Sequence, residues 1–443
     1  MTGRRRSFTS GLPTVERVTQ LAERTDRAEI AVPRQSAPQT PSAPQSRLAS
    51  LDGLRGVAAF GVLLHHLYLV AIPVLIDQGG SGPGSAVWWL SDTPLKLATA
   101  GAEAVLVFFI LSGLVVALPV IRQKDFVWSA FLGGRLIRLY LPVWASLALG
   151  TVLLLIVPRD PAMVTGGSWL ATANATSTTV ASLLHQGALT QASYDINNVL
   201  WSLRWELAFS VLLPVFVAVA MLVRRRWWAA AIAAVVLSAV GAQTNTPALK
   251  YLPIFFLGTL LAVQLDVVRE WMRRRMLRPR ARLWSAGLVA GSLLVLVAGW
   301  LVRSVAPAGT LANDLTTDFE AIGAVGLVIA AIGAPFLRRG LESRGCQWLG
   351  RISFSLYLVH VPIITALAFL LGDRMWWLVA AIGIPLSLAV GWGFHTLVEG
   401  PSHRLARWVT TRIAARVSAR PPVVGAQAVG AQAVGRSVRS AEE

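Results

Sequence analysis

The stretch LDGLRGVAAFGVLLHHLYLV, residues 51–70, is predominantly apolar but contains Arg55, His65 and His66. Comparable apolar runs recur along the 443-residue chain, separated by breaks rich in arginine or in glycine, proline and serine. A bilayer core about 30 Å thick requires about 20 residues of helix, because each residue adds about 1.5 Å. The pattern therefore predicts a bundle of membrane-spanning helices.

The composition supports this prediction. Hydrophobic residues make up 55% of the chain and charged residues only 14%, whereas a soluble domain carries about 25% charged residues. We predict an all-α, polytopic membrane bundle of about ten spans. Their predicted ranges are 52–75, 101–121, 136–157, 198–222, 227–242, 249–265, 283–302, 317–337, 346–370 and 375–398.

The positions of lysine and arginine predict the orientation of these spans. With a cytoplasmic N-terminus, the cations of the outer loops are Lys96, Arg159, Lys250, Arg303 and Arg374. The remaining cations, including Arg224–Arg226 and the run from Arg269 to Arg282, then fall almost entirely on the inner side. Inner loops of membrane proteins are enriched in lysine and arginine. We therefore expect both termini in the cytoplasm and the protein in the plasma membrane.

The formal net charge of +18 could also suggest a nucleic-acid partner. The arginines, however, lie at predicted membrane borders rather than on one continuous face with aromatic residues. Attraction to anionic lipid headgroups explains them better. The single cysteine, Cys346, rules out a disulfide within the chain and a metal cluster built from thiols, and we expect no metal site. A small apolar filler is the better interpretation of Cys346 than a nucleophile.

The two ends of the chain differ from the apolar middle. Residues 1–48 are rich in proline, serine, glutamine, threonine and arginine and lack the apolar core of a signal peptide, which predicts a disordered cytoplasmic tail. Residues 406–443 are predicted to be a basic, low-complexity cytoplasmic tail, in which GAQAV occurs twice, at 425–429 and 430–434. Residues 49–405 are then the transmembrane domain.

Ionisable groups inside a membrane helix are costly, so each is a candidate functional residue. Arg55 and His66 are eleven residues apart, which places them on one helix face but about 16 Å apart along the axis. Such a pair suits an elongated ligand that is held at its charged end and reacts at the other. An imidazole can take up a proton near neutral pH. Alternatively, Arg55 reaches lipid headgroups and His66 hydrogen-bonds a neighbouring helix.

The start of the third predicted span contains Arg135 and Arg138, which are three residues apart and share a face. Two guanidinium groups in this arrangement suit phosphate groups. Anchoring of the helix at the inner membrane border is an equally simple explanation, and from these residues alone it is the stronger one.

The fourth predicted span contains Ser202 and Glu206, which are i,i+4 neighbours, while Arg204 points almost opposite Glu206. A carboxylate this far from the membrane border needs a partner, and the simplest interpretation of Glu206 is that it forms a structural ion pair. In the ninth span, Ser353, Tyr357 and His360 fall within about 60° of each other and form a polar stripe.

The end of the tenth predicted span reads Glu399-Gly400-Pro401. We expect the helix to stop at the proline, on the inner side.

Taken together, these segments resemble the acyltransferase type 3 family of membrane O-acyltransferases. The resemblance covers residues 50–405, and it consists of six motifs in the family's order. They are R-x10-H (Arg55, His66), F-F-x-L-S-G (Phe108 to Gly113), R-x-x-R (Arg135, Arg138), W-S-L-x-x-E (Trp201 to Glu206), G-x-I-S-Y-S-x-Y-L-x-H (Gly350 to His360) and E-x-P (Glu399, Pro401).

The resemblance implies transfer of an acyl group, with acetyl as the expected group, from cytoplasmic acyl-CoA to a hydroxyl of a carbohydrate or glycosylated small molecule, with no permanently bound cofactor. His66 would act as the general base, and Arg135 and Arg138 would hold the phosphates. We expect a catalytic group of His66, Arg55 and Glu206. The expected substrate-binding residues are Arg135, Arg138, Ser202, Ser353, Tyr357, His360 and Glu399.

Four residues depart from the family's usual pattern, and they put the identity of the acceptor in doubt. Arg204 and Trp205 stand where the family has small or β-branched residues, and Ser210 and Phe354 stand where tyrosine is common. Two other classes of function remain. A transporter would also contain buried histidine, arginine and glutamate, although the hydropathy pattern shows no internal repeat. A sensor or scaffold could keep the motifs for packing alone.

Overall fold

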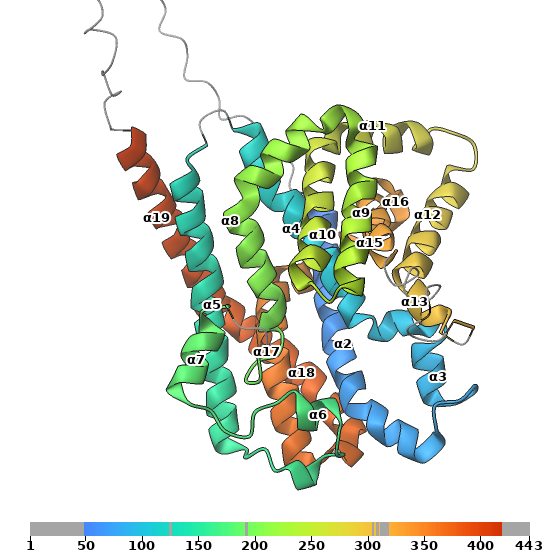
Figure 1. Ribbon diagram of the computed structural model, residues 1–443, viewed down its shortest axis with the longest axis vertical. Coiled ribbons are helices and arrows are strands. Elements are labelled where there is room, and N and C mark those ends of the chain that lie inside the picture. Colours follow the sequence, from blue (N-terminus) through green and yellow to red (C-terminus); the bar gives the residue numbers. More distant parts are fainter. Residues whose placement is uncertain are drawn as a thin grey trace, which may run out of the picture. The chain divides into compact units, whose positions relative to one another are not determined.

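The computed structural model describes residues 48–418, except 124–125, 191–193, 304, 307–309 and 311–318. Over this part of the chain the regular structure is entirely helical (Figure 1). The fold class predicted from the sequence is therefore confirmed. Residues 1–47 and 419–443, which hold nearly all of the predicted N-terminal tail and both GAQAV copies, lie outside the described residues.

Each of the ten predicted spans coincides with a helix. The ten helices are α2 (Ala49–Gly79), α4 (Gly101–Arg122), α5 (Trp128–Ile156), α8 (Leu200–Leu222), α9 (Trp227–Gln243), α10 (Pro247–Val263), α12 (Ala281–Leu296), α15 (Glu320–Gly333), α17 (Arg344–Leu371) and α18 (Trp376–Phe394).

Among the described residues, seven segments are long and apolar enough to cross a membrane by themselves, and they contain α2, α4, α5, α8, α9, α17 and α18. Two more would come from bent pairs: α10 turns by 70° into α11 (Leu265–Met276), and α15 turns by 88° into α16 (Pro335–Leu341). The remaining helix, α12, is shorter but apolar. Length and composition thus give seven to nine spans, against the ten predicted.

Short elements connect these helices. They are α3 (Ala86–Ser91), η1 (Pro94–Thr99), η2 (Pro161–Met163), α6 (Trp169–Thr172), α7 (Val180–Gly187), η3 (Arg224–Arg226), α13 (Ala298–Leu301) and η4 (Asp373–Met375). Several begin with a hydroxyl cap, since the side chains of Ser85, Thr93, Ser168 and Thr179 each accept a hydrogen bond from a backbone N–H of the first turn. Such caps satisfy donors that have no partner within the helix.

Glycines bring the central helices α2 and α17 into backbone contact. A Cβ atom on Gly56 would overlap the backbone of Gly350, and one on Gly350 would overlap that of Asp52. Gly113 of α4 and Gly258 of α10 form a similar close pair. Small residues allow helices to approach closely where lipid gives no hydrophobic drive for association. The α2–α17 contact is important for function because both helices carry candidate site residues.

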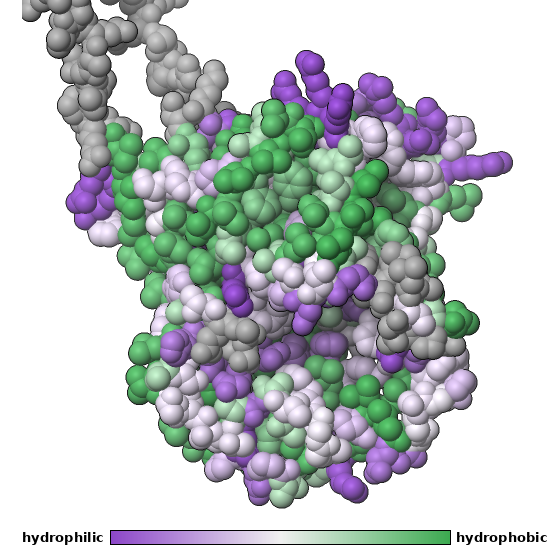
Figure 2. Space-filling model, in the orientation of Figure 1, coloured by the Kyte–Doolittle hydropathy of each residue, from purple (hydrophilic) through white to green (hydrophobic). Residues whose placement is uncertain are grey.

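The outer surface is consistent with a lipid environment. Large apolar side chains are exposed on the helices; Leu155 is 75% exposed and Leu222 is 84% exposed. Figure 2 shows a broad apolar area over the upper half of this face, capped by hydrophilic side chains where α11 lies. Arg273 and Arg274 of α11 pair there with Glu270 and remain largely exposed. We call this end of the bundle the arginine-rich end.

Two of the cations predicted for the outer loops are buried. The amino group of Lys96 in η1 lies 3.7 Å from the centre of the Trp300 ring, and burial lowers its pKa. Arg159 donates to the carbonyl oxygens of Ala175 and Asp195, and burial lowers its pKa to about 10. Lys96 and Arg159 therefore hold connecting segments together and add little exposed positive charge.

The prediction that the last helix ends at Pro401 is wrong. After α18 the chain makes a π-helical turn, η5 (His395–Glu399), and continues as α19 (Gly400–Ser418). Pro401 has no N–H, but it stands in the first turn of α19, where an N–H would have no partner within that helix, so proline is tolerated there. The predicted domain boundary at residue 405 lies inside α19, which packs against α5 through Thr410 and Ala130.

Candidate active site

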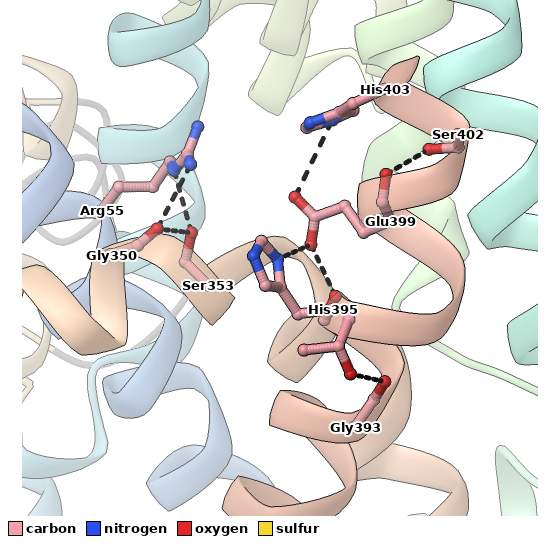
Figure 3. Close-up of polar contacts among 10 residues, drawn as sticks. Arg55, Gly350, Ser353, Gly393, His395, Glu399, Ser402 and His403 are labelled. Carbon is pink, nitrogen blue, oxygen red and sulfur yellow. Dashed lines mark hydrogen bonds and ion pairs between the residues drawn. The ribbon is translucent and has the colours of Figure 1, made fainter. Parts of the chain in front are cut away.

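Arg55 and His66 lie on α2 and contact different levels of α17. The Nε of Arg55 donates to Ser353 Oγ at 2.9 Å, and its Nη2 donates to the Gly350 carbonyl at 3.3 Å (Figure 3). His66 instead meets His360. Ser353 and His360 are separated by about 10 Å of helix rise. Arg55 and His66 thus contact α17 at two separate levels, in agreement with the separation along the helix axis that the sequence predicted.

The two histidines form a buried pair. His360 Nε2 and His66 Nδ1 are 3.2 Å apart, and their side chains belong to residues that are 0% and 7% exposed. The ring of Trp169, on α6, packs edge-on against His66 with centroids 5.3 Å apart. The neighbouring His65 points elsewhere, with its Nδ1 2.8 Å from the Thr99 carbonyl oxygen. The two adjacent histidines therefore have different surroundings.

A cavity of about 290 Å³ opens between α2, α4, α5, α8, α17 and the α18–α19 junction. Its polar and charged lining residues are Asp52, Arg55, Ser112, Arg135, Arg138, Ser202, Glu206, Ser353, Tyr357, Glu399 and His403. Eight of the ten predicted site residues are among them. The other two, His66 and His360, are not among the residues that line this cavity in the described structure.

Arg135 and Arg138 both line the cavity, but their surroundings differ. Arg135 Nη2 forms an ion pair with Glu206 Oε1 at 2.6 Å, and its Nε donates to Ser210 Oγ at 3.1 Å. Arg138 Nε donates to the Gly134 carbonyl of its own helix at 3.3 Å. Glu206, for which the sequence left the partner open, thus pairs with Arg135. Ser210, which departs from the family's pattern, accepts a hydrogen bond from the same guanidinium.

Tyr357 lies between the cavity and the histidine pair. Its hydroxyl is 2.7 Å from Ser202 Oγ, and its ring packs against Phe108, with centroids 5.7 Å apart. On the other side, the ring centroid of Tyr357 is 6.0 Å from that of His360. The predicted polar stripe of Ser353, Tyr357 and His360 therefore leads from the cavity to the pair.

Glu399 is the centre of a cluster that the sequence analysis did not find. Its Oε2 accepts from Ser355 Oγ at 2.5 Å and lies 3.0 Å from His395 Nδ1, while its Oε1 lies 3.9 Å from His403 Nε2 (Figure 3). The spacing H-x3-E-x3-H was a usable signal, because i,i+4 residues share a helix face. The assumption that Pro401 ended the helix removed His403 from the pattern, but the spacing of His395 and Glu399 was still available. His403 and Arg55 line the same cavity.

Arg204, the other conspicuous departure from the family's pattern, does not belong to the cavity lining among the described residues. Its guanidinium lies over the ring of Trp205, 5.0 Å from the ring centre.

Comparison with known proteins supports the resemblance noted in the sequence. A family model described as an acyltransferase domain, that of acyltransferase family 3, matches residues 48–396. Acyltransferase MdmB of Streptomyces mycarofaciens is 30% identical over 386 residues, which cover 81% of this chain and 92% of that protein. O-acetyltransferase PaAT-1 of Phomopsis amygdali is 27% identical over 384 residues, which cover 75% of each chain. No solved structure matches. The chain therefore belongs to the acyltransferase type 3 family and is a membrane O-acyltransferase.

Proposed function

We propose that this protein transfers an acyl group, acetyl in the first instance, from acyl-CoA to a hydroxyl of a carbohydrate or glycosylated small molecule. The donor enters the cavity from the cytoplasm, and the protein is a multi-pass protein of the plasma membrane with its arginine-rich end facing inward. The choice of acetyl is supported by the name of one relative, an O-acetyltransferase.

The observation that carries the proposal is the connection between the cavity and the histidine pair. Three arginines, Arg55, Arg135 and Arg138, line the cavity, and Tyr357 separates it from His66 and His360. A volume of about 290 Å³ is at the lower limit for ligand sites of about 300–1,000 Å³. It suits the slender pantetheine arm of CoA, with the nucleotide remaining at the mouth. The arginines supply charge for the phosphates.

His66 acts as the general base in this proposal. It takes the proton of the acceptor hydroxyl while the hydroxyl oxygen attacks the thioester carbonyl carbon. The new carbon–oxygen bond forms, the carbon–sulfur bond breaks, and the CoA thiolate leaves and takes up the proton from His66. The products are the O-acyl ester and free CoA, so charge and protons balance.

The ion pair between Arg135 and Glu206 limits what Arg135 can offer a ligand. A guanidinium that already holds a carboxylate at 2.6 Å has fewer free donors than one that does not. We therefore assign the main phosphate contact to Arg138. Glu206 holds Arg135 in place and belongs to the donor side of the site. This proposed role differs from the expectation from the sequence that Glu206 is catalytic.

Thioester turnover tests the proposal against its rival. Protein purified into lipid nanodiscs is mixed with acetyl-CoA and candidate glycosides, and free thiol and acetylated product are measured. Equal amounts of thiol and product, both abolished by His66→Ala, are the expected result. A transporter would instead give uptake of solute into proteoliposomes without any turnover of thioester, and that result would overturn the assignment.

A further inference from the structure

The hydrogen-bond partners of the histidine pair determine where the protons lie. His66 Nδ1 is 2.9 Å from the carbonyl oxygen of Val62, and His360 Nδ1 is 2.9 Å from that of Leu356. A carbonyl oxygen can only accept. A nitrogen at this distance in a buried site must therefore carry a hydrogen, because two facing lone pairs would leave both groups unsatisfied.

Once both Nδ1 atoms carry a hydrogen, the contact between the two neutral rings has only one assignment. With hydrogen on its Nδ1, His360 has an unprotonated Nε2, and this nitrogen faces His66 Nδ1 at 3.2 Å. His66 Nδ1–H then donates to both the Val62 carbonyl and His360 Nε2. The opposite tautomers would place unprotonated Nδ1 atoms against two carbonyl oxygens. The contacts thus favour one arrangement over the other at both rings.

We propose that His360 and the Val62 carbonyl hold His66 in the Nδ1–H tautomer, so that its Nε2 is the basic atom, and that His360 is the residue that positions the catalytic base. This inference rests on the proposed function, in which His66 is the general base. It assigns to His360 a role other than substrate binding. His360 Nε2 accepts from the ring that becomes charged, in the way a second group orients a catalytic histidine in hydrolases.

The transfer of the proton explains why such a partner is useful. When His66 Nε2 takes the hydroxyl proton, the ring becomes an imidazolium whose Nδ1–H is a stronger donor. His360 Nε2 is already positioned to accept from it, so no reorientation is needed during the reaction. Among the described contacts, Trp169 meets His66 through its ring and His65 Nδ1 lies at the Thr99 carbonyl, so the side-chain hydrogen-bonding contact of His66 is with His360.

The tautomer can be measured directly in the resting protein. Histidine labelled with ¹⁵N gives separate signals for protonated and unprotonated ring nitrogens, and the signals of His66 are identified by their loss in His66→Ala. We expect a protonated Nδ1 and an unprotonated Nε2 for His66. A protonated Nε2 in the neutral ring would overturn the inference, whatever the protein catalyses. Activity retained by His66→Ala would contradict the proposed function instead.

Two amide variants test the positioning role of His360. In His360→Gln the amide oxygen reaches the place of Nε2 and can still accept from His66, whereas in His360→Asn the amide falls near the place of Nδ1 and cannot. Loss of a partner that orients a functional histidine costs about 10–100-fold. We expect kcat to fall by that factor in His360→Asn, with unchanged acyl-CoA affinity, and to recover largely in His360→Gln. Equal kcat values in the two variants would refute the role.

Discussion

The cavity and the histidine pair show opposite ways of placing polar groups in one membrane bundle. The cavity holds arginines and carboxylates, and the side chains of its central pair, Arg135 and Glu206, remain 20% and 26% exposed. The pair of His66 and His360 is enclosed, and its ring nitrogens meet backbone carbonyls and one another. In the proposed function, the partly exposed arginines bind the phosphates of the donor, while the enclosed His66 is the neutral base.

This difference between the cavity and the histidine pair explains the value of Tyr357, which contacts both. In the proposed reaction, merging the charged cavity with the enclosed base would expose the base or desolvate the charges. Tyr357 lines the cavity and its ring faces His360, while Phe108 packs against Tyr357 and also lines the cavity. In the proposed reaction only the reactive end of the donor has to pass these two rings, and the phosphates stay with the arginines.

The largest expected effect comes from the base itself. His66→Ala should lower the rate of acetyl transfer by about 10²–10⁴-fold, because a general base contributes about that much. His65→Ala should keep most of the activity, since His65 faces Thr99. Initial rates at matched protein levels in nanodiscs measure both. Equal losses of activity in the two variants would show that His66 has no role that His65 lacks.

The next effect tests the close contact between α2 and α17, the two helices that carry the histidine pair and part of the cavity lining. Gly56→Ala should destabilise the fold by about 1–3 kcal/mol, the usual result of overpacking, because the new Cβ overlaps the backbone of α17. The matched control is Gly61→Ala on the same helix, where the added Cβ meets no atom within 4 Å. Thermal unfolding in detergent compares them. The same melting temperature for both variants would contradict the close contact.

A smaller effect concerns the cavity alone. Arg138→Lys should weaken acyl-CoA binding by about tenfold, since an ammonium lacks the planar fork of a guanidinium and loses about one charged hydrogen bond. Arg274→Lys, on the exposed surface of α11, is the control and should bind normally. Equilibrium binding of acyl-CoA gives both values. Unchanged affinity of Arg138→Lys would leave helix anchoring as the better explanation for this arginine.

The last prediction changes no activity and tests which side each region faces. Reporter fusions at Arg4 and Arg436 should both report from the cytoplasm, because the arginine-rich end is expected to face inward. A C-terminal reporter on the outside would mean an odd number of spans. The cavity could then no longer be assigned to a cytoplasmic donor, while the histidine pair would be unaffected.

Much of the site was accessible from spacing along single helices. Arg55 and His66 on one face, and the stripe of Ser353, Tyr357 and His360, follow from about 100° per residue. Errors arose where the backbone departs from a regular helix. After the π-turn at His395–Glu399 the chain continues through Pro401 as α19. The rule that a helix usually ends before a proline therefore failed there. His403, which lies beyond Pro401, was missed for this reason, whereas His395 lies inside the tenth predicted span and was overlooked although it is four residues before Glu399.

The sequence by itself determined the helical class, the approximate positions of the apolar helices and their suitability for a membrane, but not the number of spans. These depend on runs of apolar residues and on the helical period, which are local properties. The tertiary structure decided which polar groups meet. His66 and His360 are 294 positions apart, and Arg135 and Glu206 are 71 apart. Glycine contacts bring α2 and α17, and with them His66 and His360, together. Which helices pair cannot be read from any one helix alone.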